Sequence, residues 1–133
     1  MTISKLILVT IVVRDIEEAL SFYVGKLGFE KKHDFPISKD RPMVMVAPKN
    51  QKEVAIVLRK PFAGDNELLT SELDREIGRG SLLTFSTSNC NETYEKLKSQ
   101  GVKFINQPIM KEYGLEAIFE DNYGNRFSIL EIK

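Results

Sequence analysis

The sequence has no tryptophan, one cysteine and one histidine among its 133 residues. A single cysteine, Cys90, excludes an internal disulfide framework. The single imidazole, His33, has no placed partner and therefore forms neither a catalytic triad nor a histidine-based metal site. We interpret His33 as a half-exposed strand histidine and Cys90 as a small buried residue in the first turn of a helix.

Charge of one sign and long apolar runs are also missing. The 19 basic and 19 acidic residues cancel, and no window concentrates Lys and Arg as nucleic acid or an anionic membrane would require. No apolar run approaches the roughly 18 residues of a membrane span, and the N-terminus does not read as a secretion signal. We therefore expect a soluble, cytoplasmic protein with no nucleic-acid or membrane partner.

Two stretches of the chain resemble each other. The first begins at Leu8 (LVTIVVRDIEEALSFYVGKLGF) and the second at Leu82 (LLTFSTSNCNETYEKLKSQGVKF). Equivalent positions hold similar residue types, namely Leu8 and Leu82, Thr10 and Thr84, Asp15 and Asn89, Glu18 and Glu92, and Gly28 and Gly101. A period of about 74 residues is too long for a stacked repeat, so the pattern indicates a duplicated half of one domain.

Each half is predicted to be a βαβββ module. The first half reads as a strand covered on both faces, a helix and three more strands, at residues 6–13, 15–28, 29–35, 42–47 and 54–58. The second half repeats this order at residues 81–87, 89–101, 102–105, 115–119 and 126–132. We expect one domain, 1–133, with modules at 1–60 and 81–133 and a polar linker at 61–80 that can form a short helix.

Caps and turns delimit these elements. Asp15 and Asn89 are the predicted N-caps, each followed three residues later by a glutamate in the pattern of a capping box. Gly28 and Gly101 are predicted to end the two helices. The last hairpin turn is predicted at Asn122, Gly124 and Asn125, whose residue types suit tight turns.

With VRDIEEALSFYVGKLGFE near its start and EDNYGNRFSILE at its end, the chain resembles the vicinal oxygen chelate superfamily. That superfamily includes glyoxalase I, extradiol dioxygenases and the bleomycin-binding resistance proteins. The resemblance covers nearly the whole chain and implies an α+β fold in which two βαβββ modules form a curved mixed sheet around a central cleft. It also implies a homodimer. The reaction does not follow, because one scaffold hosts many chemistries.

In the metal-dependent members, strands from both halves supply His, Glu or Gln ligands to one divalent ion. The resemblance places the four ligand positions on Leu8, Leu82, Ser128 and either Ile56 or Val57. Divalent metals need several converging carboxylates or imidazoles, which three apolar groups and one hydroxyl do not provide. We therefore predict no metal and no cofactor.

The predicted function is binding of a small, apolar or aromatic molecule, as in the antibiotic-sequestering branch of the superfamily. Sequestration needs affinity and no chemistry, so a missing metal is no handicap. The predicted pocket is lined by residues of both halves: Leu8, Thr10, Val57, Leu82, Thr84, Arg126 and Ser128.

Two alternatives remain at this stage. One is a lyase, isomerase or dioxygenase that recruits a metal through His33, Glu53, Glu116 or Glu120. The other is a structural or regulatory subunit that keeps the fold without binding a ligand.

For several other side chains the sequence leaves open a role in ligand binding and an ordinary structural role. Arg126 either pairs with an anionic ligand group or points to water. Glu116 and Glu120 alternate along one strand, which is typical of a solvated sheet face and can also place an acid in a cleft. A ligand-stacking or pocket role competes with an ordinary turn or core role for Tyr113, Tyr123, Met43, Met45 and Met110.

Overall fold

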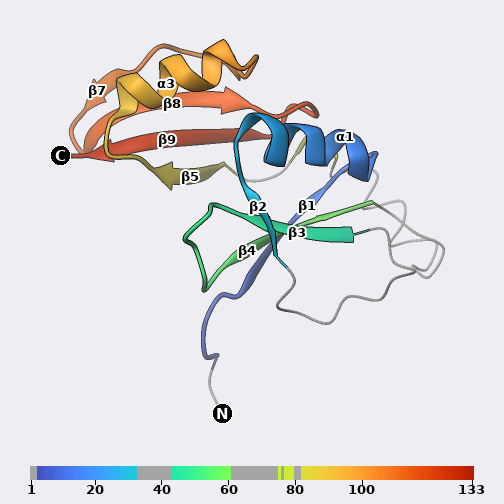
Figure 1. The fold of residues 1–133 in the computed structure, drawn as a ribbon. Coiled ribbons are helices and arrows are strands. Elements are labelled where there is room, and N and C mark those ends of the chain that lie inside the picture. The colour runs from blue at the N-terminus through green and yellow to red at the C-terminus, as the bar shows by residue number, and fades with distance from the viewer. Residues whose placement is uncertain (1–2, 33–42, 61–74, 76, 80–81) are drawn as a thin grey trace. The chain divides into compact units, whose positions relative to one another are not determined.

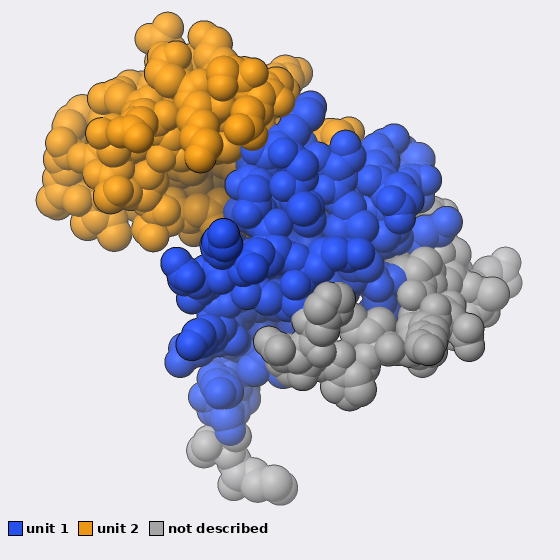
Figure 2. Space-filling model, in the orientation of Figure 1, with its two compact units in different colours: residues 1–77 blue, residues 78–133 orange. Residues whose placement is uncertain are grey.

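The computed structural model describes residues 3–32, 43–60, 75, 77–79 and 82–133. The chain divides into two compact units, Met1–Ile77 and Gly78–Lys133, shown in blue and orange in Figure 2. His33 lies outside the described residues, as does most of the predicted 61–80 linker with its short helix. Each unit is described below by itself.

Unit 1 contains a four-stranded mixed sheet. Its strands lie in the order β1-β4-β3-β2 and span Leu8–Val12 (β1), Glu30–Lys32 (β2), Met43–Ala47 (β3) and Ala55–Arg59 (β4). Strand β1 pairs in parallel with β4, whereas β3 pairs antiparallel with both β2 and β4 (Figure 1). The first half is therefore βαβββ, as predicted.

The helix of unit 1 begins where its cap predicts. Asp15 accepts a hydrogen bond from the Glu18 backbone N–H at 2.9 Å, and the α-helix α1 follows at Ile16–Leu20. It continues into a π-helical turn, η1, at Ser21–Lys26, which the sequence did not indicate. Gly28 follows with φ +77°, the left-handed conformation that favours glycine. Among the described residues, no helix is long and apolar enough to cross a membrane.

Unit 2 repeats this arrangement with one additional strand. Its elements are β5 (Leu83–Ser86), α3 (Cys90–Ser99), β6 (Lys103–Phe104), β7 (Ile109–Lys111), β8 (Gly114–Glu120) and β9 (Arg126–Ile132). The sheet order is β5-β9-β8-β6, with β7 also paired to β8 and β5 parallel to β9. The molecule is thus an α+β protein with two mixed sheets, as the sequence predicted.

The two turns that frame β8 have different origins. The predicted turn before β9 is confirmed: Gly124 has φ +89°, and both carboxylate oxygens of Asp121 accept hydrogen bonds from Asn125 at 2.8 Å. The β7–β8 hairpin was not predicted, because Ile109–Lys111 is too short to show a period. Neither β6 nor β7 contributes a residue that pairs with Ile118. The side-chain oxygen of Asn106 accepts the hydrogen bond of the Ile118 N–H instead, at 2.9 Å.

Helix α3 covers one face of the unit 2 sheet with an aromatic core. Its Tyr94 ring lies 4.7 Å from that of Phe104, which lies 5.5 Å from Phe119. Phe119 in turn stacks on Phe127 at 5.5 Å. Because side chains alternate along a strand, the neighbours of Phe119 in β8 and of Phe127 in β9 point to the opposite face of the sheet. That face carries the polar groups described in the next section.

The first strand differs from its prediction. Residues 6–13 were expected to form a strand covered on both faces, but β1 begins at Leu8 and Leu6 is 65% exposed. Thr10, in the middle of β1, is also exposed. The physical reason is that the partner strand β4 begins at Ala55, opposite Leu8, and that β1 lies at the edge of the sheet formed by the described residues of unit 1.

Gly114, at the start of β8, tests the close packing of this sheet. It has φ +147°, and a Cβ added there would overlap the backbone oxygen of Glu131 on β9. We expect Gly114→Ala to lower the free energy of unfolding by about 2 kcal/mol or more, measured by urea unfolding followed by circular dichroism. The control is Gly25→Ala, because Gly25 lies in the η1 turn with no heavy atom within 4 Å of the added Cβ. It should change stability by no more than about 1 kcal/mol, in the stabilising direction. Equal effects of the two substitutions would contradict the close approach.

Candidate functional site

The face of the unit 2 sheet opposite to α3, called the open face below, carries polar side chains from four strands. Register places Ser128 of β9 opposite both Thr84 of β5 and Ile118 of β8. Strand alternation then puts Glu116 on the same face as these residues. Lys111 reaches this face from β7, whose pairing places it opposite Gly114.

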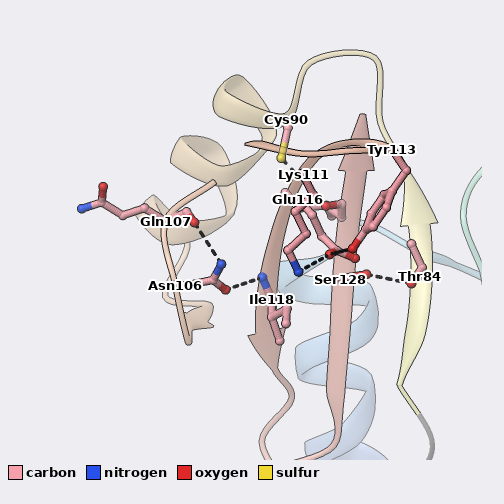
Figure 3. A network of polar contacts seen from close by, with 10 residues as sticks. Thr84, Cys90, Asn106, Gln107, Lys111, Tyr113, Glu116, Ile118 and Ser128 are labelled. Atoms are coloured by element: carbon pink, nitrogen blue, oxygen red, sulfur yellow. Dashed lines mark hydrogen bonds and ion pairs between the residues drawn. The ribbon is translucent and has the colours of Figure 1, made fainter. Parts of the chain in front are cut away.

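Glu116 is the centre of this group. One of its carboxylate oxygens accepts hydrogen bonds from the Tyr113 hydroxyl at 2.7 Å and from the Lys111 ammonium at 3.0 Å (Figure 3). Glu116 is 7% exposed, so the interpretation of its strand as a solvated face is wrong at this position. The β7–β8 hairpin is the cause, because it folds Lys111 and Tyr113 back over the carboxylate.

These contacts change the proton affinity of both charged groups. The hydrogen bond from Tyr113 is the main reason why the pKa of Glu116 is lowered, and the hydrogen bond from Lys111 acts in the same direction against the effect of burial. The hydrogen bond to Glu116 correspondingly raises the pKa of Lys111. Both groups are therefore charged at neutral pH, as an ion pair.

A pair of hydroxyl groups lies beside this ion pair. The Ser128 hydroxyl, which is fully buried, donates to the Thr84 hydroxyl oxygen at 2.7 Å. Thr84 itself is exposed. Figure 3 shows Lys111 and Tyr113 directed at Glu116, and Ser128 directed at Thr84.

The predicted pocket residues of unit 1 have a different character. Thr10 lies opposite Val57 in the parallel pair of β1 and β4. Val57 is buried in an apolar cluster that also contains Met45, Ala47 and Ala55, with Leu8 and Met43 packed against it. Met45 is thus buried in this cluster and Met43 packs against it, while Thr10 is the exposed member of this face.

Three of the predicted pocket residues of unit 2 lie on the open face, and the fourth directly precedes strand β5. Thr84 and Ser128 are in contact, and Arg126 is exposed on β9 opposite Glu120. Leu82 lies just before β5 and is 52% exposed. Glu120 forms a 3.6 Å ion pair with Lys103, and Met110 is 58% exposed.

Cys90 is buried, as predicted. Burial is the main cause of its raised pKa, with the neighbouring carboxylate of Glu131 acting in the same direction. The same carboxylate accepts the Cys90 backbone N–H at 2.8 Å. The thiol is therefore protonated and inert.

The four ligand positions do not fit a divalent metal. Leu8, Leu82 and Val57 carry no donor atom, and the one hydroxyl, on Ser128, is directed to Thr84. Among the residues that the structure describes, no three His, Cys, Asp or Glu side chains form a group that could hold a metal ion. Glu53, one of the alternative ligands considered above, is exposed, and Glu116 is engaged by Lys111 and Tyr113.

Lys111 is the member of this group that the sequence did not indicate. Its strand is only three residues long, and its partner Glu116 is five residues away across a turn. The pattern K-x-Y-x-x-E is the sequence signal that could have indicated this contact, and it is a weak one.

Comparison with known proteins shows which family and which solved structures the chain is similar to. The model of the glyoxalase/bleomycin resistance protein/dioxygenase superfamily matches residues 5–129. The uncharacterised protein YurT of Bacillus subtilis (strain 168) is 30% identical over 129 residues, 96% of this chain and 98% of YurT. The crystal structure of UcmS2 is similar at 36% identity and a TM-score of 0.81, covering 98% of this chain and 99% of that one. TnmS3, an antibiotic binding protein from Streptomyces sp. CB03234, is 27% identical with a TM-score of 0.74, covering 100% and 99%.

The Tyr113 hydroxyl provides a test of the polar group. The folded-state pKa of Glu116 lies below the ordinary value of 4.5, so its contribution to stability is present at neutral pH and is lost as pH falls through the lowered pKa. We expect Tyr113→Phe to cost about 1–2 kcal/mol at neutral pH and much less in acid, where Glu116 is protonated. Urea unfolding across this pH range and carboxyl NMR titration of Glu116 measure the two effects.

The matched control is Tyr94→Phe, which alters a tyrosine on the helix-covered face. It should leave the Glu116 titration unchanged. A Glu116 titration that is the same in Tyr113→Phe and in the parent protein would show that the hydrogen bond does not lower the pKa.

Proposed function

The chain belongs to the glyoxalase/bleomycin resistance protein/dioxygenase superfamily, and from this membership we propose that it binds a small, largely apolar or aromatic molecule without transforming it. The bound molecule would be held without a metal. Binding of this kind requires a concave or open apolar surface with a few placed polar groups.

The side chains at the four ligand positions are the observation that best supports this function. In place of carboxylates and imidazoles the chain has two leucines, an isoleucine or a valine, and a serine. Catalysis by a chelated metal needs donors at these positions, whereas binding needs only complementary surface. The same substitution that disfavours a chelate therefore favours an apolar ligand.

Similarity to TnmS3 supports the ligand class. TnmS3 is an antibiotic binding protein, and the two chains align over almost their full lengths. We propose that this protein likewise sequesters an antibiotic-like organic molecule. The proposed contact residues are those predicted from the sequence in unit 2: Leu82, Thr84, Arg126 and Ser128.

A homodimer and a cytoplasmic location are also proposed, the first from the family resemblance and the second from the composition of the sequence. Analytical ultracentrifugation of the purified chain tests the first proposal. A single species with the mass of one 15.2 kDa chain at micromolar concentration would rule it out.

Ligand binding is tested by thermal denaturation with a panel of bleomycin-type glycopeptides, aromatic acids and epoxide antibiotics. A ligand that binds only the folded state stabilises it by about 2.7 kcal/mol at a concentration of 100 Kd, which raises Tm by roughly 5–10 °C. We expect at least one aromatic member of the panel to produce such a rise. No rise with any member would favour a structural subunit.

Substitution on the open face locates the binding surface. Thr84→Trp places a bulky ring at an exposed position of unit 2, and we expect it to reduce or abolish the Tm rise. Glu95→Trp, on the exposed side of α3, is the control and should retain it. An unchanged rise in Thr84→Trp would place binding elsewhere.

Metal analysis separates the proposed binder from an enzyme. Protein purified without chelator should contain less than about 0.1 equivalent of any transition metal, because the ligand positions lack donors. A stoichiometric metal that is lost on Glu116→Gln or Glu120→Gln would contradict the proposal and support the metal-dependent alternative.

A further inference from the structure

On the open face of unit 2 two hydrogen-bond donors, Lys111 and Thr84, are at least partly exposed, whereas the carboxylate of Glu116 is buried. This asymmetry follows from three sets of contacts, those of Glu116, of Ser128 with Thr84, and of Lys111. Together they restrict the chemical groups that the face can bind.

Glu116 is not available as an acceptor for a ligand. Its side chain is 9% exposed, and one of its oxygens already accepts two hydrogen bonds. A ligand that sought this oxygen would have to displace Lys111 or Tyr113. Such a displacement would leave a buried ion or a phenol without its partner, which is costly.

The hydroxyl pair presents a proton at Thr84. A serine hydroxyl has a single proton, and Ser128 donates it to Thr84. Because Glu116 already receives hydrogen bonds from Tyr113 and Lys111, it does not require the Ser128 proton as well. The Thr84 oxygen therefore accepts from Ser128, and because Thr84 is exposed, its own proton can be donated to a molecule on this face.

Lys111 presents further donors on the same face. Its ammonium carries three N–H groups, and its side chain is 39% exposed. One N–H is directed at Glu116, and the nitrogen lies 6.0 Å from the centre of the Tyr113 ring. The remaining N–H groups can reach a molecule lying on the sheet.

Apolar side chains surround these donors. Register places Leu130 opposite Glu116, Ile118 opposite Ser128 and Ile109 opposite Glu116, all on the same face. Ile109 and Tyr113 are each 48% exposed. A flat apolar ring fits such a surface, provided that it carries an acceptor for the donors.

We propose that Lys111 and Thr84 are hydrogen-bond donors to oxygen atoms of the bound molecule, so that the ligand class is aromatic compounds bearing a carbonyl or carboxylate group. This assignment rests on the proposed binding function and narrows it. Lys111 favours a carboxylate by charge, and Thr84 supplies a neutral donor suited to a ketone.

The experiment compares three probes of one shape: 2-naphthoate, 2-acetylnaphthalene and 2-ethylnaphthalene. Titration calorimetry on the full chain measures each Kd. The two oxygen-bearing probes should bind about fivefold or more tightly than the hydrocarbon, as expected for one added hydrogen bond. Thr84→Val should weaken 2-acetylnaphthalene about fivefold, and Lys111→Met should weaken 2-naphthoate about tenfold or more. Neither substitution should alter the affinity for 2-ethylnaphthalene.

Two controls keep the result interpretable. Lys103→Met removes the other Lys–Glu pair of β8, and Thr93→Val removes the other threonine hydroxyl pair, so both should leave all three affinities unchanged. Because Lys111→Met leaves Glu116 without its ammonium partner, Lys111→Met/Glu116→Gln is measured alongside it and should show the same loss for 2-naphthoate.

The outcomes distinguish the two levels of the proposal. If 2-ethylnaphthalene binds as tightly as the other two probes, the donor pair is wrong and the binding function stands. If no probe binds and the broader antibiotic panel gives no rise in Tm, both the binding function and the donor pair are overturned.

Discussion

The parallel pairing of the first and last strands of each unit is the constraint on which the site depends. A parallel pair needs a crossover, and the helix after the first strand supplies it on one face of the sheet. In unit 2 this pairing brings Thr84 beside Ser128, and in unit 1 it brings Thr10 beside Val57. Because side chains alternate along each strand, the same register decides which residues pack under α3 and which lie on the open face of unit 2.

The two units use the equivalent face differently. In unit 1 it is an apolar cluster around Met45 and Val57. In unit 2 the equivalent position is Ser128, and a buried carboxylate, Glu116, lies diagonally across from it. A buried carboxylate is tolerated only with partners, and the short β7–β8 hairpin supplies Lys111 and Tyr113. The two units therefore differ on the equivalent face, which is apolar in unit 1 and carries buried polar groups in unit 2.

Prediction from the sequence succeeded where the physics is local. The caps at Asp15 and Asn89 hold because a side-chain oxygen three residues from a backbone N–H needs no distant partner. Met45 and Cys90 are buried, because small or apolar residues within strongly indicated strands and helices usually pack in the core. Prediction failed at Leu6 and at Glu116, where exposure depends on which strand pairs with which and on a hairpin too short to leave a periodic signal.

The sequence by itself determined the duplicated βαβββ pattern, the family resemblance and the absence of chelating side chains at the ligand positions, since each of these is a matter of residue type and spacing along the chain. Tertiary structure alone decided that Glu116 is buried, that Lys111 and Tyr113 donate to it, and that Ser128 gives its proton to Thr84. Strand register is responsible for this division. It brings residues 44 positions apart in the chain to hydrogen-bonding distance, and no local pattern encodes that contact.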